Sequence, residues 1–252
     1  MTTSPRTGMV PVDDTALAFT DTGGPGRSVL YLNGSYASQR SWRPVIAELG
    51  TGWRHITYDE RARGASKRSA DYSFEACLRD VGAIVAASDV DRPLLVGWPY
   101  GAALAVHWAA RNPDRVAGVV VVDGAMPWGL TGEANRERIR RIFGRMRFLL
   151  PLASPFGLAA RMTAAQHAEV NIEINEICAA LDPVLDRLTC PVSYVLATGA
   201  NLGGGRGGDG GDAGHARSGA SPQPAPAGQL QGAEQPHADP AQGLPGRRHR
   251  RA

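Results

Sequence analysis

Short apolar runs and stretches of helical periodicity alternate along the first half of the chain. Apolar runs predict strands at residues 16–20, 28–32, 54–58, 94–97 and 116–123. Residues 42–49 predict a helix, and so does the stretch that begins at Ser73, a suitable N-cap, with Val81, Ile84 and Val85 on one face. Strands that alternate with helices form mostly parallel, doubly wound sheets that are covered on both faces. An α/β fold is therefore expected.

The pattern changes in the second half of the chain. Residues 126–188 are mostly helical in pattern, and Val192–Ala197 is the last run that predicts a strand. Residues 203–252 contain no Ile, Val, Phe, Tyr, Trp, Met or Cys. A segment of this composition cannot bury a core, so we expect a disordered, low-complexity tail.

The most informative stretch is Pro93–Arg111, where a buried-strand signal, a sharp turn and a helix follow one another. The turn reads Gly97-Trp98-Pro99-Tyr100-Gly101, which has the frame of a nucleophile elbow, G-x-S-x-G. In that motif the central residue lies on a strained turn, and the glycines leave room for the neighbouring strand and helix. Here the centre is Pro99, which has neither a nucleophilic atom nor a backbone N–H. The frame of the elbow is present, but its nucleophile position is inert.

Further motifs follow in a familiar order. Residues 31–35, Tyr-Leu-Asn-Gly-Ser, resemble a strand that ends in His-Gly, with Asn33 in place of the histidine. Residues 59–66 resemble a D-x-R-G-x-G-x-S turn, with Ala62 in place of its first glycine. Residues 112–116 and the apolar strand that ends at Asp123 complete the pattern. Together with the elbow, these motifs resemble the α/β-hydrolase fold family from Val10 to about Asn201.

The resemblance implies a fold and a division of the chain. The implied fold is a mostly parallel, doubly wound sheet of the α/β-hydrolase type with a helical cap, truncated after the penultimate strand. Residues 1–125 would form the N-terminal part of the core, residues 126–188 the cap and residues 189–202 the last core strand. Residues 203–252 would be the tail.

A serine hydrolase needs a nucleophile, a base and an acid that orients the base. By the resemblance, Pro99 stands at the nucleophile position and Asp123 is either the acid or a structural loop residue. The backbone N–H groups of Ser35 and Tyr100 would form the oxyanion hole, and Gly97 and Gly101 are the elbow glycines. No histidine stands where the family has its base. His107 is expected to be a core or packing residue, and His55 and His167 are not expected to be catalytic; His215, His237 and His249 lie in the tail.

Two functions follow from this set. The first is an ester- or amide-type small-molecule hydrolase whose catalytic set is broken. The second is a protein on the same fold that binds a small ligand without turning it over. A third interpretation is an interaction tail, in which residues 247–251, Arg-Arg-His-Arg-Arg, touch acidic partners. No cofactor or metal is expected.

Charge and cysteine content limit the expected partners and the expected cellular compartment. There are 27 basic and 24 acidic residues, a net charge of +3, which argues against nucleic acid or a membrane as the main partner. The three cysteines, Cys77, Cys178 and Cys190, have no metal-site spacing and indicate a reduced, cytoplasmic setting. The first residues lack the apolar segment of a signal peptide. Arginines crowd the stretch 136–147, and we interpret them as a solvated helix face, with acidic-substrate binding as the alternative.

The tail admits two origins. When the degenerate codons for residues 231–246 are read one base later, they permit a histidine loop followed by a closing amphipathic helix. One interpretation is therefore a frameshifted C-terminus, and the other is a genuine low-complexity tail.

Overall fold

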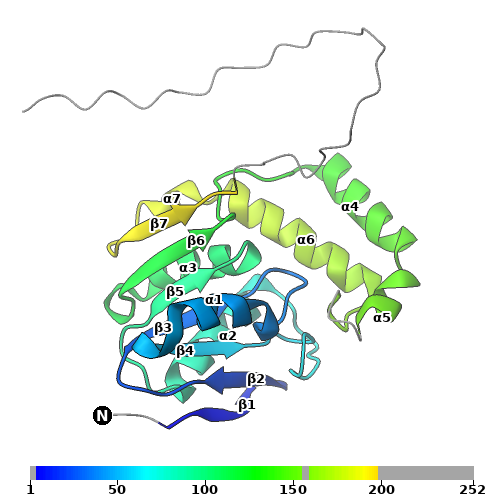
Figure 1. The fold of residues 1–252 in the computed structure, drawn as a ribbon. Helices are drawn as coiled ribbons and strands as arrows, with labels where there is room; N and C mark the ends of the chain where they lie inside the picture. Colours follow the sequence, from blue (N-terminus) through cyan, green and yellow to red (C-terminus); the bar gives the residue numbers. More distant parts are fainter. Residues whose placement is uncertain (1–3, 155–158, 198–252) are drawn as a thin grey trace, which may run out of the picture. The chain divides into compact units, whose positions relative to one another are not determined.

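The computed structural model describes residues 4–154 and 159–197, and within them seven strands form one sheet (Figure 1). The sheet order is β1-β2-β4-β3-β5-β6-β7. From β4 to β7 every neighbouring pair is parallel, whereas β1 and β2 add an antiparallel edge. The predicted mostly parallel sheet is confirmed. Its strands are β1 Arg6–Val12, β2 Thr15–Asp21, β3 Arg27–Leu32, β4 Trp53–Tyr58, β5 Leu94–Gly97, β6 Gly118–Val122 and β7 Val192–Val195.

Strand β1 is an element that the apolar pattern did not predict. It pairs with β2 in register from Arg6 opposite Asp21 to Val12 opposite Thr15. Only Val10 of its seven residues is buried, so the strand carries almost no hydrophobic signal. Its backbone hydrogen bonds to β2 hold it in place, and a tight turn through Asp13, at φ +48°, joins the two strands.

Helices cover both faces of the sheet. On one face, α2 (Phe74–Ala87) and α3 (Tyr100–Arg111) bury Leu30, Leu32 and Leu95 in the main core. On the other, the 3-10 helix Gln39–Trp42 and α1 (Arg43–Leu49) cover Val29 and Tyr31. Successive strand residues point to opposite faces of the sheet, so each parallel strand contributes side chains to both cores. This is why its sequence is a continuous apolar run. Ser73 is the N-cap of α2, as predicted, and its hydroxyl accepts a hydrogen bond from the N–H of Ala76.

Among the residues that the structure describes, four helices follow β6: α4 (Glu133–Arg145), α5 (Leu149–Ala153), α6 (Ala164–Ala179) and α7 (Asp182–Leu185). A small core of its own, built around Phe143, Leu150 and Ala168, joins α4, α5 and α6. Helix α6 begins at a capping box formed by Thr163 and Gln166, and its other face packs on the main core through Val170. This helical segment is therefore attached to the sheet by α6 and α7.

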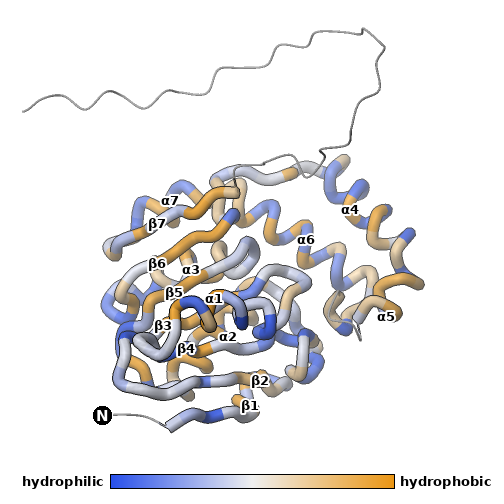
Figure 2. The backbone as a smooth tube through the Cα atoms, in the orientation of Figure 1, coloured by the Kyte–Doolittle hydropathy of each residue, from blue (hydrophilic) through white to orange (hydrophobic). Residues whose placement is uncertain are grey.

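Strand β7 lies at one edge of the sheet in the part of the chain that the structure describes. Figure 2 shows it as largely hydrophobic, and the side chains toward its end are nevertheless in solvent: Tyr194 is 43% and Val195 is 53% exposed. Leu196, just beyond the strand, is 52% exposed. The predicted tail, residues 203–252, lies outside the described residues.

Candidate active-site cavity

The glycine frame of the elbow is present and necessary. A Cβ at Gly97 would lie 2.3 Å from the carbonyl oxygen of Gly101, and one at Gly101 would lie 2.2 Å from that of Leu32. Backbone bonds close the turn further, because Gly101 N–H donates to the Asn33 carbonyl at 2.9 Å. The strand and the helix therefore approach as closely at this turn as an elbow requires.

The centre of the elbow has a different backbone conformation from that of the motif. Pro99 lies at φ −63°, ψ −36°, in the right-handed helical region, as the N-cap residue of α3. The pyrrolidine ring locks φ near this value, so the strained conformation expected at an elbow centre is absent here. Positive φ values occur instead in the loop after β6, at Asp123 (48°) and Ala125 (49°), which also line the cavity. Gly124 between them lies against Pro99, since a Cβ there would be 2.4 Å from the Pro99 carbonyl oxygen.

A cavity of about 760 Å³ lies above the carboxyl ends of the strands. It brings together Ser35, Pro99, Tyr100 and Asp123, which the sequence separates by almost 90 positions. Parallel strands end at one edge of the sheet, which is why residues that follow β3, β5 and β6 meet there. The rest of the wall is mostly aromatic and aliphatic, and is formed by Tyr36, Trp98, Met126, Trp128, Ile174 and Cys178.

The backbone N–H groups of Ser35 and Tyr100, both at the cavity, have no hydrogen-bond partner among the described residues. The loop that carries Ser35 is held from behind, because Arg63 Nε donates to the Ser35 carbonyl at 2.6 Å. Tyr100 N–H is free because it begins helix α3, where the first N–H groups have no intrahelical acceptor. Free N–H groups of this kind can bind a carbonyl oxygen or an anion.

Asn33, which stands where the family has histidine, anchors the same loop. Its amide nitrogen donates to Glu60 Oε2 at 2.8 Å and to the Tyr58 carbonyl at 2.7 Å, while its Oδ1 accepts from Trp42 Nε1 at 2.7 Å. Glu60 also accepts from Asn33 N–H at 3.0 Å, and burial raises the pKa of this carboxyl. Asn33 and Glu60 thus support the loop and do not line the cavity.

Asp123 follows β6 directly, and its N–H donates to the Val195 carbonyl at 2.8 Å. Its carboxylate accepts no hydrogen bond from any described residue and lines the cavity that Pro99 lines. This position is suited to binding the donor group of a ligand or an imidazole.

None of the three histidines within the described ranges lines the cavity, although His167 stacks on Tyr36 of its wall. His55 bonds through its two ring nitrogens to the Tyr31 hydroxyl and the Gly50 carbonyl, each at 2.9 Å. His167 stacks on Phe143, and burial lowers its pKa. Burial also lowers the pKa of His107, to about 4, and its Nε2 is buried without a partner. His107 is thus buried in the core, as predicted, and His55 and His167 pack beside neighbouring side chains; the histidines of the tail lie outside the described residues.

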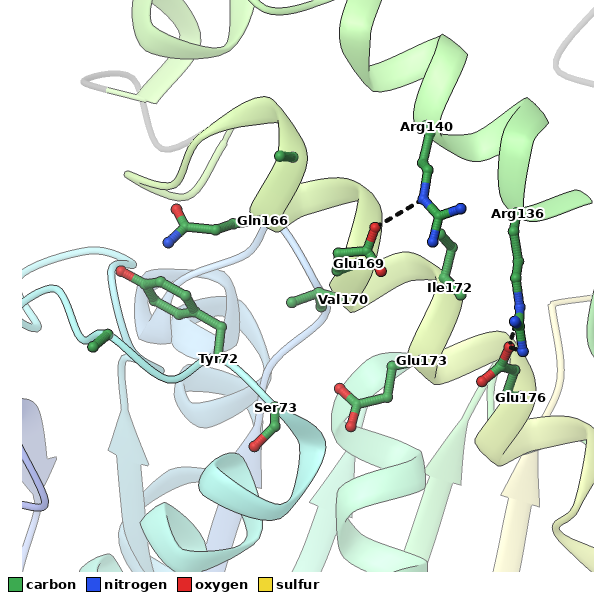
Figure 3. A pocket seen from close by; sticks show the side chains of 12 residues that line it. Tyr72, Ser73, Arg136, Arg140, Gln166, Glu169, Val170, Ile172, Glu173 and Glu176 are labelled. Atoms are coloured by element: carbon green, nitrogen blue, oxygen red, sulfur yellow. Dashed lines mark hydrogen bonds and ion pairs between the residues drawn. The ribbon is translucent and has the colours of Figure 1, made fainter. Parts of the chain in front are cut away.

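A second, open cavity of about 530 Å³ lies between residues 70–73 and helices α4 and α6 (Figure 3). Arg140 Nε donates to Glu169 at 2.9 Å and Arg136 Nε donates to Glu176 at 2.7 Å, so these charges neutralise one another. Glu173 accepts from Phe74 N–H at 2.9 Å at the start of α2, and burial raises its pKa. The polar side chains that line this second cavity are thus largely paired with one another, and the cavity contains none of the predicted site residues.

Within residues 4–154 and 159–197, no group of three or more His, Cys, Asp or Glu side chains could hold a metal ion. No helix in these ranges is long and apolar enough to cross a membrane.

The sheet order, the elbow frame and the cavity at the strand ends are those of an α/β hydrolase, and comparison with known proteins agrees. The model of the alpha/beta hydrolase fold family matches residues 27–169, which is more than half of the chain. The chain therefore belongs to the α/β-hydrolase fold family.

Similar proteins extend this result. A haloalkane dehalogenase of Mesorhizobium japonicum is 32% identical over 147 residues, which are 58% of this chain and 48% of that protein. Epoxide hydrolase 3 of Xenopus tropicalis is 28% identical and matches 58% of this chain and 43% of its own length. The chain thus spans about half the length of these relatives. Among solved structures, an enol-lactonase from Burkholderia xenovorans has a TM-score of 0.54 at 19% identity, covering 76% of this chain and 81% of its own, which shows the fold alone.

Much of the cavity wall could not be identified from sequence. Ile174, Asn175 and Cys178 come from α6, whose apolar pattern does not distinguish a face on the core from a face on a cavity. Trp98 and Tyr36 are next to Pro99 and Ser35, which the motifs did identify. Only this adjacency in the sequence could have indicated that they line the cavity.

Proposed function

We propose that this protein is a small-molecule hydrolase of the ester or amide type by descent, whose present form turns substrate over very slowly or not at all. The observation that carries the proposal is Pro99 in the cavity wall at the nucleophile position. Asp123 is proposed as the acid of the ancestral triad, and the N–H groups of Ser35 and Tyr100 as its oxyanion hole.

Two features support low activity. Pro99 offers neither of the side-chain groups, hydroxyl or carboxylate, that act as nucleophiles at such positions. The histidines within the described residues are engaged in packing, so none of them stands beside Pro99 as a base.

The test is hydrolysis of an activated ester such as p-nitrophenyl acetate by the wild type, Pro99→Ser and Pro99→Asp. We expect the wild type to remain near the buffer rate. We also expect no burst of acyl-enzyme from Pro99→Ser by mass spectrometry, because its hydroxyl lacks a base, and no sustained turnover by Pro99→Asp, because no base activates the water of the second step. Rapid turnover by the wild type that disappears in Ser35→Ala or Ser41→Ala would identify another nucleophile and refute the proposal.

A second candidate function is binding without turnover, favoured by the intact, mostly apolar cavity of about 760 Å³. The ligand class would be small apolar molecules with one carbonyl group. Ethyl benzoate and benzamide are suitable probes, with thermal shift as the measurement. Cys178→Phe fills the cavity and should abolish the shift, whereas Cys190→Phe, outside the cavity wall, should retain it. Equal shifts in both variants would exclude binding at this cavity.

The cellular setting is proposed on the same terms. The three cysteines are free in the structure, and two of them are half-buried. Free thiols of this kind are compatible with a reduced cytoplasm, in keeping with the sequence.

A further inference from the structure

Helix α4 has two chemically different faces. Its inner face carries Arg136 and Arg140, which pair with carboxylates, and Phe143, which is buried in the small core. Its outer face carries Arg138, Arg141 and Arg145, spaced by three and four residues so that they lie on one side of the helix. The α4 arginines are therefore divided between a structural role and an exposed one.

The outer arginines are exposed and form no ion pair with any described residue. Arg147, just after the helix, is also exposed, and its guanidinium lies 4.5 Å from the centre of the Phe148 ring. The chain has no Asp or Glu between Glu137 and Glu169. A strong local positive charge therefore exists in a protein whose overall charge is only +3.

Large apolar side chains are exposed beside this charge. Phe148 and Leu152 are each 69% exposed and Leu149 is 61% exposed, on and just before the short helix α5. Ile142, on the outer face of α4 itself, is 43% exposed. Figure 2 shows α5 as hydrophobic next to the mixed colours of α4. Three large side chains exposed to this extent within five residues are unusual on a soluble surface and indicate an interaction site.

We propose that this face, the outer arginines of α4 together with Phe148, Leu149 and Leu152, docks on an anionic lipid surface. Arginine heads at the level of lipid phosphates with Phe and Leu inserted below them are typical of interfacial segments. A second copy of this chain fits poorly, because a two-fold interface would place the same arginines opposite one another. Nucleic acid would satisfy the arginines and leave the leucines in water.

The proposal revises an expectation from composition. A net charge near zero argued against a membrane surface, but a net charge is an average over the whole chain. The ion pairs between α4 and α6 neutralise Arg136 and Arg140 and leave the outer arginines of α4 unpaired among the described residues. The face is also separate from the cavity, since none of its residues lines it. Docking would bring the protein to a phase in which apolar molecules concentrate.

The experiment is co-sedimentation of the full chain with vesicles of phosphatidylcholine alone or with one-third phosphatidylglycerol. We expect binding to the anionic vesicles that falls as salt rises. Each basic residue near such a surface strengthens binding about fivefold, so Arg141→Glu/Arg145→Glu should weaken it at least about 25-fold. The matched control, Arg40→Glu/Arg43→Glu, makes the same charge change on another exposed surface and should lose much less.

The leucines distinguish a lipid surface from other polyanions. Leu149→Ser/Leu152→Ser should weaken vesicle binding while leaving any binding to RNA unchanged. In a Leu149→Trp variant, brominated phosphatidylglycerol should quench the added fluorescence, a readout that needs only one conservative change. Equal binding to neutral vesicles, an equal loss in the Arg40/Arg43 control, or no quenching at position 149 would each overturn the proposal. Vesicle binding that is unaffected by the serine changes would assign the face to polyanions in general and overturn it too.

Discussion

Acidification should destabilise this protein through His107, which is buried on α3. Its ring lies edge-to-face with the ring of Phe74, and the two ring centres are 5.0 Å apart. Burial, aided by the charge of Arg111, lowers the His107 pKa from 6.5 to about 4. Between these values the unfolded chain binds a proton that the folded chain excludes, so stability falls as the pH drops from 6.5 to 4. A gap of about 2.5 between the two pKa values corresponds to about 3 kcal/mol over the whole window. Outside that window this histidine contributes no pH dependence.

The assay is urea unfolding at pH values from 7 to 4, compared between the wild type and His107→Phe. Carboxylates such as Asp21, whose pKa is lowered by its hydrogen bonds with Arg54, Gly23 and Arg6, also lose stabilising energy in acid, but they do so equally in both proteins. The variant should therefore gain relative stability by up to about 1.4 kcal/mol per pH unit within the window. Leu104→Met on the same helix is the control and should keep the wild-type slope. Parallel pH profiles for the wild type and His107→Phe would refute the assignment of His107 as a neutral packing residue.

Two further changes test the frame and the edge of the sheet. Gly101→Ala should destabilise the fold by more than about 2 kcal/mol in urea unfolding, because its Cβ would lie 2.2 Å from the Leu32 carbonyl oxygen; a loss below about 0.5 kcal/mol would show that the elbow is not tightly packed. The exposed apolar strand β7 should limit soluble yield, so Tyr194→Lys/Val195→Lys should raise the monomer fraction in size-exclusion chromatography. An unchanged fraction would mean that association occurs elsewhere.

The sequence alone determined the framework of this protein, because the responsible signals are local. Alternating strands and helices, the N-cap at Ser73 and the glycines of the elbow depend on neighbouring residues and on backbone sterics. The resemblance to a known family assigned Ser35, Pro99 and Asp123 to one site, and the structure places all three on one cavity because parallel strands end at one edge of the sheet.

Other features depended on contacts between distant parts of the chain. Strand β1 forms because β2 supplies its hydrogen bonds, and its own side chains carry little signal. Helix α6 completes the cavity wall through a face that no periodicity could assign, and it selects which arginines of α4 are paired. Local sequence patterns reflect secondary-structure propensity and helix capping. The residues that pair with a charged side chain or that line a cavity are far apart in the sequence, so only the tertiary structure could identify them.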